Sequence, residues 1–136
     1  MRSEHGETER TVRMDYDEFE RVAQAEFDHL PEKFRSAIDN VRIVVAEDAP
    51  RTLSIRKGYS PRGVLLGLYE GIPLTRRGTG YGMYPVTPDT ITLFQRSIES
   101  VSRTDQEVRA LIRDTLIHEI GHYFGMSERE IRDAGY

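Results

Sequence analysis

The sequence contains no cysteine, only four histidines and no long run of apolar residues. Without cysteine there can be no disulfide and no thiolate ligand, so only nitrogen and oxygen atoms could hold a metal ion. No apolar stretch has the character of a signal peptide or the length needed to cross a bilayer. We therefore expect a cytoplasmic protein that has no membrane partner.

Excess positive charge is also lacking. The formal net charge is −4 over 136 residues, which argues against nucleic acid as the main partner. Two basic stretches, residues 51–62 and 76–77, are more typical of solvated loops than of a phosphate-binding patch. The sequence leaves open that an arginine in one of them engages a carboxylate of a substrate.

The length predicts one domain with a single core. Residues 1–14 are polar and charged without periodicity, so we expect a disordered arm there, with His5 idle in solvent. The domain would then span residues 15–136. We find no internal repeat and no second domain boundary.

Apolar spacing predicts a helix from Asp15 or Asp17 to Leu30 and a short one over residues 33–40. His29 would place a favourable charge at the C-terminus of the first of these helices. Three strands are expected, over residues 41–46, 64–69 and 90–95.

A long helix is predicted to begin at Ser102 or Thr104, with Glu107 completing a capping box from Thr104, and a short helix over residues 127–136 ends the chain. Residues 76–85 are rich in glycine and predict a loop. A functional alternative is a mobile flap over a cleft, with Tyr81 or Tyr84 donating a hydrogen bond to an oxyanion.

The stretch His118-Glu119-Ile120-Gly121-His122 carries the most specific chemical pattern in the chain. Helical residues four apart are rotated by only about 40° and lie about 6 Å apart along the axis, so both imidazoles can reach one metal ion. Glu119 is offset by about 100°, which suits a base that takes a proton from a nearby water. We predict His118 and His122 as metal ligands and Glu119 as the catalytic residue. The alternative is a buried amphipathic helix with two hydrogen-bonded histidines.

Gly125 is predicted to end this helix, because glycine accepts the left-handed conformation found after helix C-termini. The chain can then turn back so that Glu128 points at the same ion as the preferred third ligand. Alternatively, Glu128 is an exposed acid at a helix N-terminus, and Glu130 or an acid elsewhere replaces it. Glu130 is otherwise a candidate partner for a histidine N–H, and so is Asp114, one turn before His118, for which a surface charge is the favoured interpretation.

The sequence HEIGHYFGMSE, from His118 to Glu128, resembles the zincin metallopeptidase signature in its longer HExxHxxGxx(H/D) form, which is associated with metzincin-like enzymes. Residues 65–74 and 89–96 also resemble small bacterial single-domain zincin-like proteins, so the resemblance covers roughly residues 15–136. Two features depart from the pattern. Glu128 stands where the family has His or Asp, and only eight residues follow it, too few for the methionine-containing turn of metzincins.

The resemblance implies a zincin-like α+β fold, in which a small mixed sheet of three to four strands packs against helices that include the motif helix. It implies Zn²⁺ as cofactor and hydrolysis of a peptide or protein substrate, with Glu119 as general base toward a metal-activated water. Two other interpretations stay open: a zincin-fold metal- or peptide-binding module with little or no turnover, and a structural zinc protein. An intact Glu119 argues against the binding module, which has no need of a base.

Overall fold

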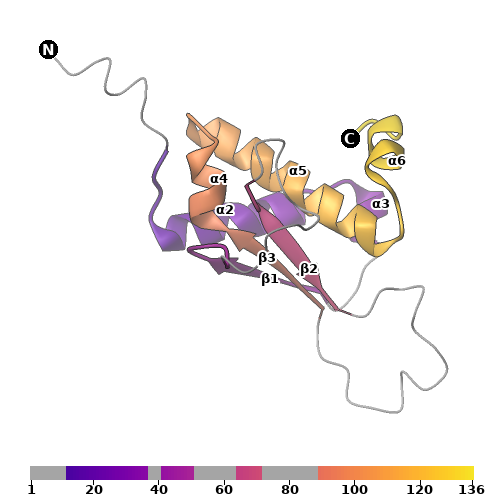
Figure 1. Ribbon diagram of the computed structural model, residues 1–136, viewed down its shortest axis with the longest axis horizontal. Helices are drawn as coiled ribbons and strands as arrows, with labels where there is room; N and C mark the ends of the chain where they lie inside the picture. Colours follow the sequence, from indigo (N-terminus) through magenta and orange to yellow (C-terminus); the bar gives the residue numbers. More distant parts are fainter. Residues whose placement is uncertain (1–11, 37–40, 51–63, 72–88) are drawn as a thin grey trace, which may run out of the picture.

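The computed structural model describes residues 12–36, 41–50, 64–71 and 89–136. Within these residues a three-stranded sheet is covered on one face by helices. The long helix α5 (Asp105–Tyr123) runs alongside the strands, and α6 (Glu128–Asp133) folds back from its C-terminal end (Figure 1). This is the α+β architecture that the sequence predicts.

The strands are β1 (Val41–Ala46), β2 (Gly67–Glu70) and β3 (Asp89–Phe94). Their order is β1-β3-β2, with β3 parallel to β1 and antiparallel to β2. Ile91 and Leu93 of β3 are fully buried, whereas the alternate residues Thr90 and Thr92 are partly exposed. One face of the sheet therefore carries the core, as the period of two along a strand requires.

Helices α2 (Tyr16–Asp28) and α5 pack against each other and against that face. Phe19, Val22 and Ala23 form the buried stripe of α2, at the spacing of one helical face. The short helix α3 (Glu32–Arg35) follows and buries Phe34. Because α2 lies on β1 and α5 on β2, the sheet fixes the depth at which α5 sits.

A short helix that the sequence analysis missed, α4 (Gln95–Ser100), follows β3 directly. Gln95 begins this helix, so the predicted strand over residues 90–95 ends one residue early. Gln95 and Glu99 are buried on its inner face beside Ile98. Two of these three inward residues are polar, so the spacing of apolar residues does not show the period of a helix here.

The buried polar pair holds the backbone of Met14. The Met14 N–H donates to Glu99 Oε2 at 2.8 Å, and Gln95 Nε2 donates to the Met14 carbonyl at 2.9 Å and to Glu99 Oε2 at 3.0 Å. Met14 is itself buried, and Val12 packs against the core. The sequence analysis assigned residues 12–14 to the disordered arm. They are instead held against the domain, because the side chains of Gln95 and Glu99 bind the backbone N–H and carbonyl of Met14.

Gln95→Ala is expected to lower the free energy of unfolding by about 1–3 kcal/mol, since it leaves the buried Met14 carbonyl without its donor. The midpoint of urea denaturation measures this. Arg96→Ala is the matched control, because its side chain is exposed and its backbone N–H, which donates to the Glu47 carbonyl, is kept in the variant. Equal midpoints for the two variants would mean that Gln95 contributes nothing to holding the segment.

The remaining elements agree with the prediction except at their ends. The strand expected over residues 64–69 pairs with β3 over Gly67–Glu70 instead, and α3 is the described part of the helix expected over residues 33–40. His5, the glycine-rich stretch with Tyr81 and Tyr84, and both basic stretches lie outside the described residues. No helix in the described part of the chain is long and apolar enough to span a bilayer.

Candidate metal and catalytic site

Helix α5 starts at a well-defined point. The Thr104 side chain accepts a hydrogen bond from the Glu107 N–H at 3.0 Å, as predicted, but the Glu107 carboxylate accepts from the Arg103 N–H at 2.7 Å and not from Thr104. Ser102, the other candidate cap, is buried and donates to the Ile98 carbonyl at 2.8 Å. The satisfied amides at this end set where the helix begins and therefore which side chains face the core.

The second half of α5 is enclosed on more than one side. Its buried residues here are Thr115, Leu116, Ile117, Glu119, Ile120, Gly121 and Tyr123. His118 and His122 instead keep 25% and 12% of their side chains exposed. The two imidazoles therefore lie on the accessible strip of a helix that is otherwise packed all round.

The helix ends in a Schellman motif. The Met126 N–H donates to the Gly121 carbonyl and the Gly125 N–H to the His122 carbonyl, both at 2.9 Å. Gly125 has φ +84°, the left-handed conformation predicted for it. This turn reverses the chain and places the Met126 carbonyl 3.0 Å from His122 Nδ1. Since a carbonyl only accepts, Nδ1 must carry hydrogen, and Nε2 is the nitrogen left to face outward.

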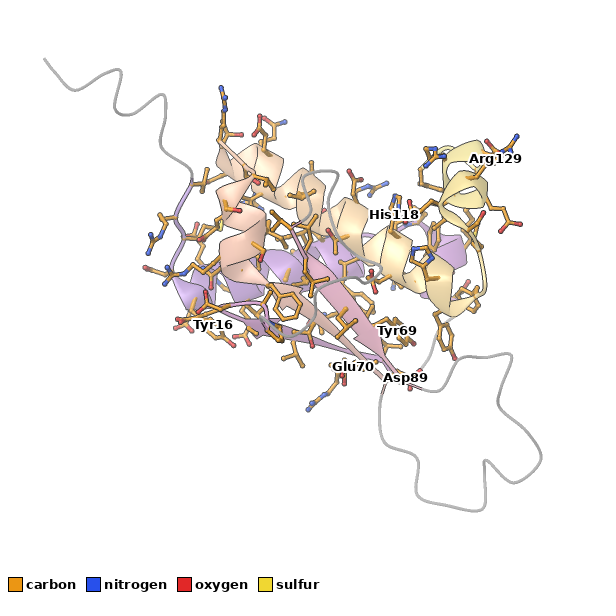
Figure 2. The ribbon with its side chains drawn as sticks, viewed as in Figure 1. Tyr16, Tyr69, Glu70, Asp89, His118 and Arg129 are labelled. Carbon is orange, nitrogen blue, oxygen red and sulfur yellow. The ribbon has the colours of Figure 1, made fainter. Side chains whose placement is uncertain are left out.

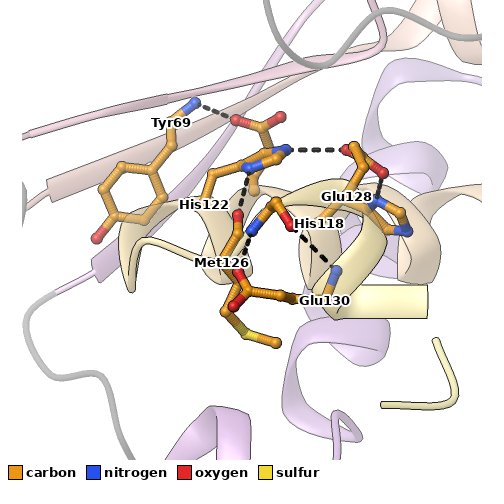
Figure 3. Close-up of polar contacts among 8 residues, drawn as sticks. Tyr69, His118, His122, Met126, Glu128 and Glu130 are labelled. Atoms are coloured by element: carbon orange, nitrogen blue, oxygen red, sulfur yellow. Dashed lines mark hydrogen bonds and ion pairs between the residues drawn. The ribbon is translucent and has the colours of Figure 1, made fainter. Parts of the chain in front are cut away.

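Glu128 closes the arrangement, as Figure 3 shows. Its Oε1 lies 2.8 Å from His118 Nδ1 and its Oε2 lies 2.9 Å from His122 Nε2. Desolvation alone would raise the pKa of Glu128, but His118 and His122 outweigh it and hold that pKa below its usual range. The carboxylate therefore stays ionised between the two imidazoles, half-exposed to solvent.

The three groups have the right chemistry for a divalent ion. A ring nitrogen and a carboxylate oxygen at these separations share a hydrogen, which a metal ion would replace on binding. Nitrogen donors with one carboxylate suit zinc, whose tetrahedral donors stand about 3.3 Å apart. The observed 2.8 and 2.9 Å are hydrogen-bond separations. Among the described residues, no group of side chains already has the spacing of a metal site. The side chains of His118, His122 and Glu128 do, however, point toward one another.

Glu119 points the other way round the helix, toward the sheet. Its Oε1 accepts a hydrogen bond from the Tyr69 N–H of β2 at 2.8 Å. Its Oε2 is buried and has no hydrogen-bond partner among the described residues. Burial raises the pKa of Glu119, and the Tyr69 N–H and His122 counter this only in part. An anchored carboxylate with one unpaired oxygen and a raised pKa is suited to receiving a proton.

Tyr69 is held in turn by its side chain. Its ring stacks on Tyr123 at 4.8 Å between centroids, and its hydroxyl donates to Asp89 Oδ2 at 2.9 Å. Figure 2 shows Tyr69, Glu70 and Asp89 together at one end of the sheet, with His118 on the helix above them. These contacts fix the strand end that aims the Tyr69 N–H at Glu119.

A family model of zincin-like metallopeptidases matches residues 38–136, which include the whole of this site. The chain belongs to the zincin-like metallopeptidase family. This confirms the resemblance found in the motif and the zincin-like fold class. No curated protein matches the sequence.

Among solved structures, this zincin-like chain is similar to a conserved hypothetical protein from T. thermophilus. The two share 22% sequence identity with a TM-score of 0.51, and the match covers 82% of this chain and 94% of that one. At this identity the likeness concerns the fold alone. It shows that almost the whole of the other protein has the same arrangement of helices and strands.

In this zincin-like domain the predicted ligands His118, His122 and Glu128 meet, whereas two other acids do not join them. Glu130 accepts from the Ser127 N–H at 2.7 Å and completes the capping box of α6, so it is not the partner of a histidine. Asp114 is exposed, as predicted.

Sequence reasoning missed the two backbone groups that orient the site, the Tyr69 N–H and the Met126 carbonyl. Backbone groups carry no residue-type signature, so no pattern could have identified them. His29, away from the site, hydrogen-bonds the Ala25 carbonyl at 2.7 Å at the end of α2, in keeping with its predicted place at a helix C-terminus.

Proposed function

We propose that this protein is a zinc-dependent metallopeptidase in which His118, His122 and Glu128 hold the ion and Glu119 is the catalytic base. The observation that carries the proposal is the pairing of two features on one helix. Three nitrogen and oxygen ligands converge on one side of α5, and the buried Glu119 carboxylate is anchored by one oxygen and unpaired at the other.

When bound, zinc would lower the pKa of a coordinated water from about 15.7 to about 7 and polarise a carbonyl. The chain's own groups supply the remaining chemistry. Glu119 Oε2 accepts the proton of the attacking water and returns it to the leaving nitrogen, so the same carboxyl acts as base and then as acid. The Tyr69 N–H keeps this carboxyl in one orientation through both transfers, and the Met126 carbonyl keeps the His122 ring in one tautomer.

The substrate class we propose is an extended peptide lying along β2. The Phe94 N–H donates to the Leu66 carbonyl, so Leu66 faces β3, and the backbone groups of the next residue, Gly67, point to the opposite edge. The Tyr69 N–H lies on that same outer edge, since it reaches Glu119. A peptide paired with this edge would run beside the metal ligands.

Removal of zinc by a chelator is expected to abolish hydrolysis of a mixed peptide library while the domain stays folded. The fold should persist because the core of α2, α5 and the sheet is buried without any contribution from the three ligands. Hydrolysis is followed by mass spectrometry and folding by far-ultraviolet circular dichroism, before chelation, after it and after zinc is restored.

Other outcomes separate the alternative functions. A domain that unfolds on chelation would identify a structural zinc site, since the metal-binding energy of such a site is folding energy. Tight zinc binding without cleavage of any peptide would identify a zincin-fold binding module. Absence of zinc binding after reconstitution would contradict the peptidase and both alternatives.

A further inference from the structure

The glycine between the two histidines lies against α6. Gly121 and His118 are three residues apart on α5, and His122 follows, so all three share one face of the helix. A Cβ added at Gly121 would stand 2.7 Å from Ile131 Cδ1 and 3.0 Å from Ile131 Cγ1. The absence of a side chain at position 121 therefore lets α6 approach this face closely. The apolar contact lies beside the place where Glu128 meets the imidazoles.

Helix α6 depends on such contacts for its position. It has six residues, too few to be stable alone. Ser127 and Glu130 form a reciprocal capping box at its start, but both are exposed and fix the helix only to itself. Ile131 has no exposed surface and is the buried residue of α6. The packing of α6 against the rest of the domain therefore depends mainly on the Ile131 side chain.

The far end of α6 is held as well. The Tyr136 N–H donates to the Ile131 carbonyl at 3.1 Å, and the Tyr136 ring meets Phe34 of α3 edge-on at 5.1 Å between centroids. Lys33 Nζ lies 4.8 Å from the centre of the Tyr136 ring. These contacts limit how α6 can pivot, so its distance from α5 is set at the Gly121–Ile131 contact.

We propose that Ile131 is a positioning residue for the metal site: seated against Gly121, it holds the first turn of α6 beside His118 and His122, where Glu128 can join them around one ion. The inference rests on the proposed zinc site and identifies what determines its affinity. Glu128 is half-exposed, and its carboxylate touches only the two imidazoles among the described residues, so nothing else fixes it.

Zinc affinity, measured by competition with a chromogenic chelator, tests the proposal. Ile131→Ala is expected to weaken binding about 10- to 100-fold, the usual cost of losing a group that orients a ligand. Gly121→Ala is expected to weaken it as well, because its methyl group displaces Ile131. Gly121→Ala combined with Ile131→Val removes the Cδ1 atom nearest the new methyl group but keeps Cγ1 at 3.0 Å, so it is expected to recover part of the affinity.

Cobalt substitution adds a measurement that a purely structural role would not change. The visible spectrum of bound Co²⁺ reports the ligand set, and it should change in Ile131→Ala and return in part in the double variant. Val108→Ala is the control, since Val108 is fully buried on α5 well before the motif, so its loss weakens the core without touching α6. Its zinc affinity and cobalt spectrum should match those of the wild type.

Each outcome decides one question. Wild-type affinity in a folded Ile131→Ala variant would overturn the inference and leave the zinc site standing. An equal loss of zinc affinity in Gly121→Ala and in the double variant would also overturn it. If the fit between positions 121 and 131 sets the position of Glu128, the smaller residue at 131 must restore part of the affinity. If the wild type itself binds no zinc, the proposed function fails and the inference fails with it.

Discussion

Glu119→Gln is expected to reduce peptide hydrolysis by about 10²- to 10⁴-fold, the range for loss of a general acid–base group. The substitution preserves shape, and the amide oxygen can still accept the Tyr69 N–H that now binds Glu119 Oε1. What is lost is the unpaired oxygen, which becomes an NH₂ group that cannot take a proton. The rate loss should therefore appear in kcat, with KM for the peptide and zinc content close to those of the wild type.

Stability offers the control for this variant. Glu119 is buried and its carboxylate has one unsatisfied oxygen, so removing the charge should leave the free energy of unfolding unchanged or slightly higher. A Glu119→Gln protein that is folded, carries zinc and cleaves peptides at the wild-type rate would remove Glu119 from the mechanism. Loss of zinc together with activity would instead indicate that Glu119 supports the metal and not the proton transfer.

Glu128→Ala is expected to weaken zinc binding by more than the roughly 10- to 100-fold that loss of an orienting partner costs, because a ligand itself is removed. Two neutral imidazoles would remain, and the negative charge that both now face would be gone. Isothermal titration calorimetry or chelator competition measures the affinity. Hydrolysis at limiting zinc should fall in parallel, whereas excess zinc should restore part of it.

Neighbouring positions supply the comparison. Arg129 is exposed on the same turn of α6, at the outer end of the molecule in Figure 2, so Arg129→Ala should bind zinc as the wild type does. Glu130→Ala tests the other acid that the sequence offered. Its carboxylate caps α6, so its loss should cost less affinity than loss of Glu128. A larger effect at Glu130 than at Glu128 would reverse the assignment of the third ligand.

Local patterns were sufficient where the determining interactions are close in the chain. The spacing of His118 and His122, the cap at Thr104 and the left-handed Gly125 are all properties of one helix and its ends, and each could be predicted. The β-branched run of β1 and the apolar stripe of α2 were equally visible, because burial on one face imposes a period on the sequence.

Where polar groups are buried, the same reasoning failed. The inward face of helix α4 includes the polar residues Gln95 and Glu99. They are buried because they bind the backbone of Met14, which is distant in sequence. A pattern based on hydrophobicity assigns such residues to the surface. For the same reason residues 12–14 were assigned to a disordered arm, although Met14 lies in the core.

The sequence by itself determined the ligand types, the motif helix and the α+β class, since these follow from residue identity and helical or strand periodicity. Only the tertiary structure decided which acid meets the histidines. Glu128 and Glu130 are both in the first turn of α6; the Glu130 carboxylate is engaged by the Ser127 N–H, whereas the turn back from α5 brings Glu128 to both imidazoles. The tertiary structure likewise brought the Tyr69 N–H to Glu119, a backbone contact across fifty residues of chain that residue identity does not encode.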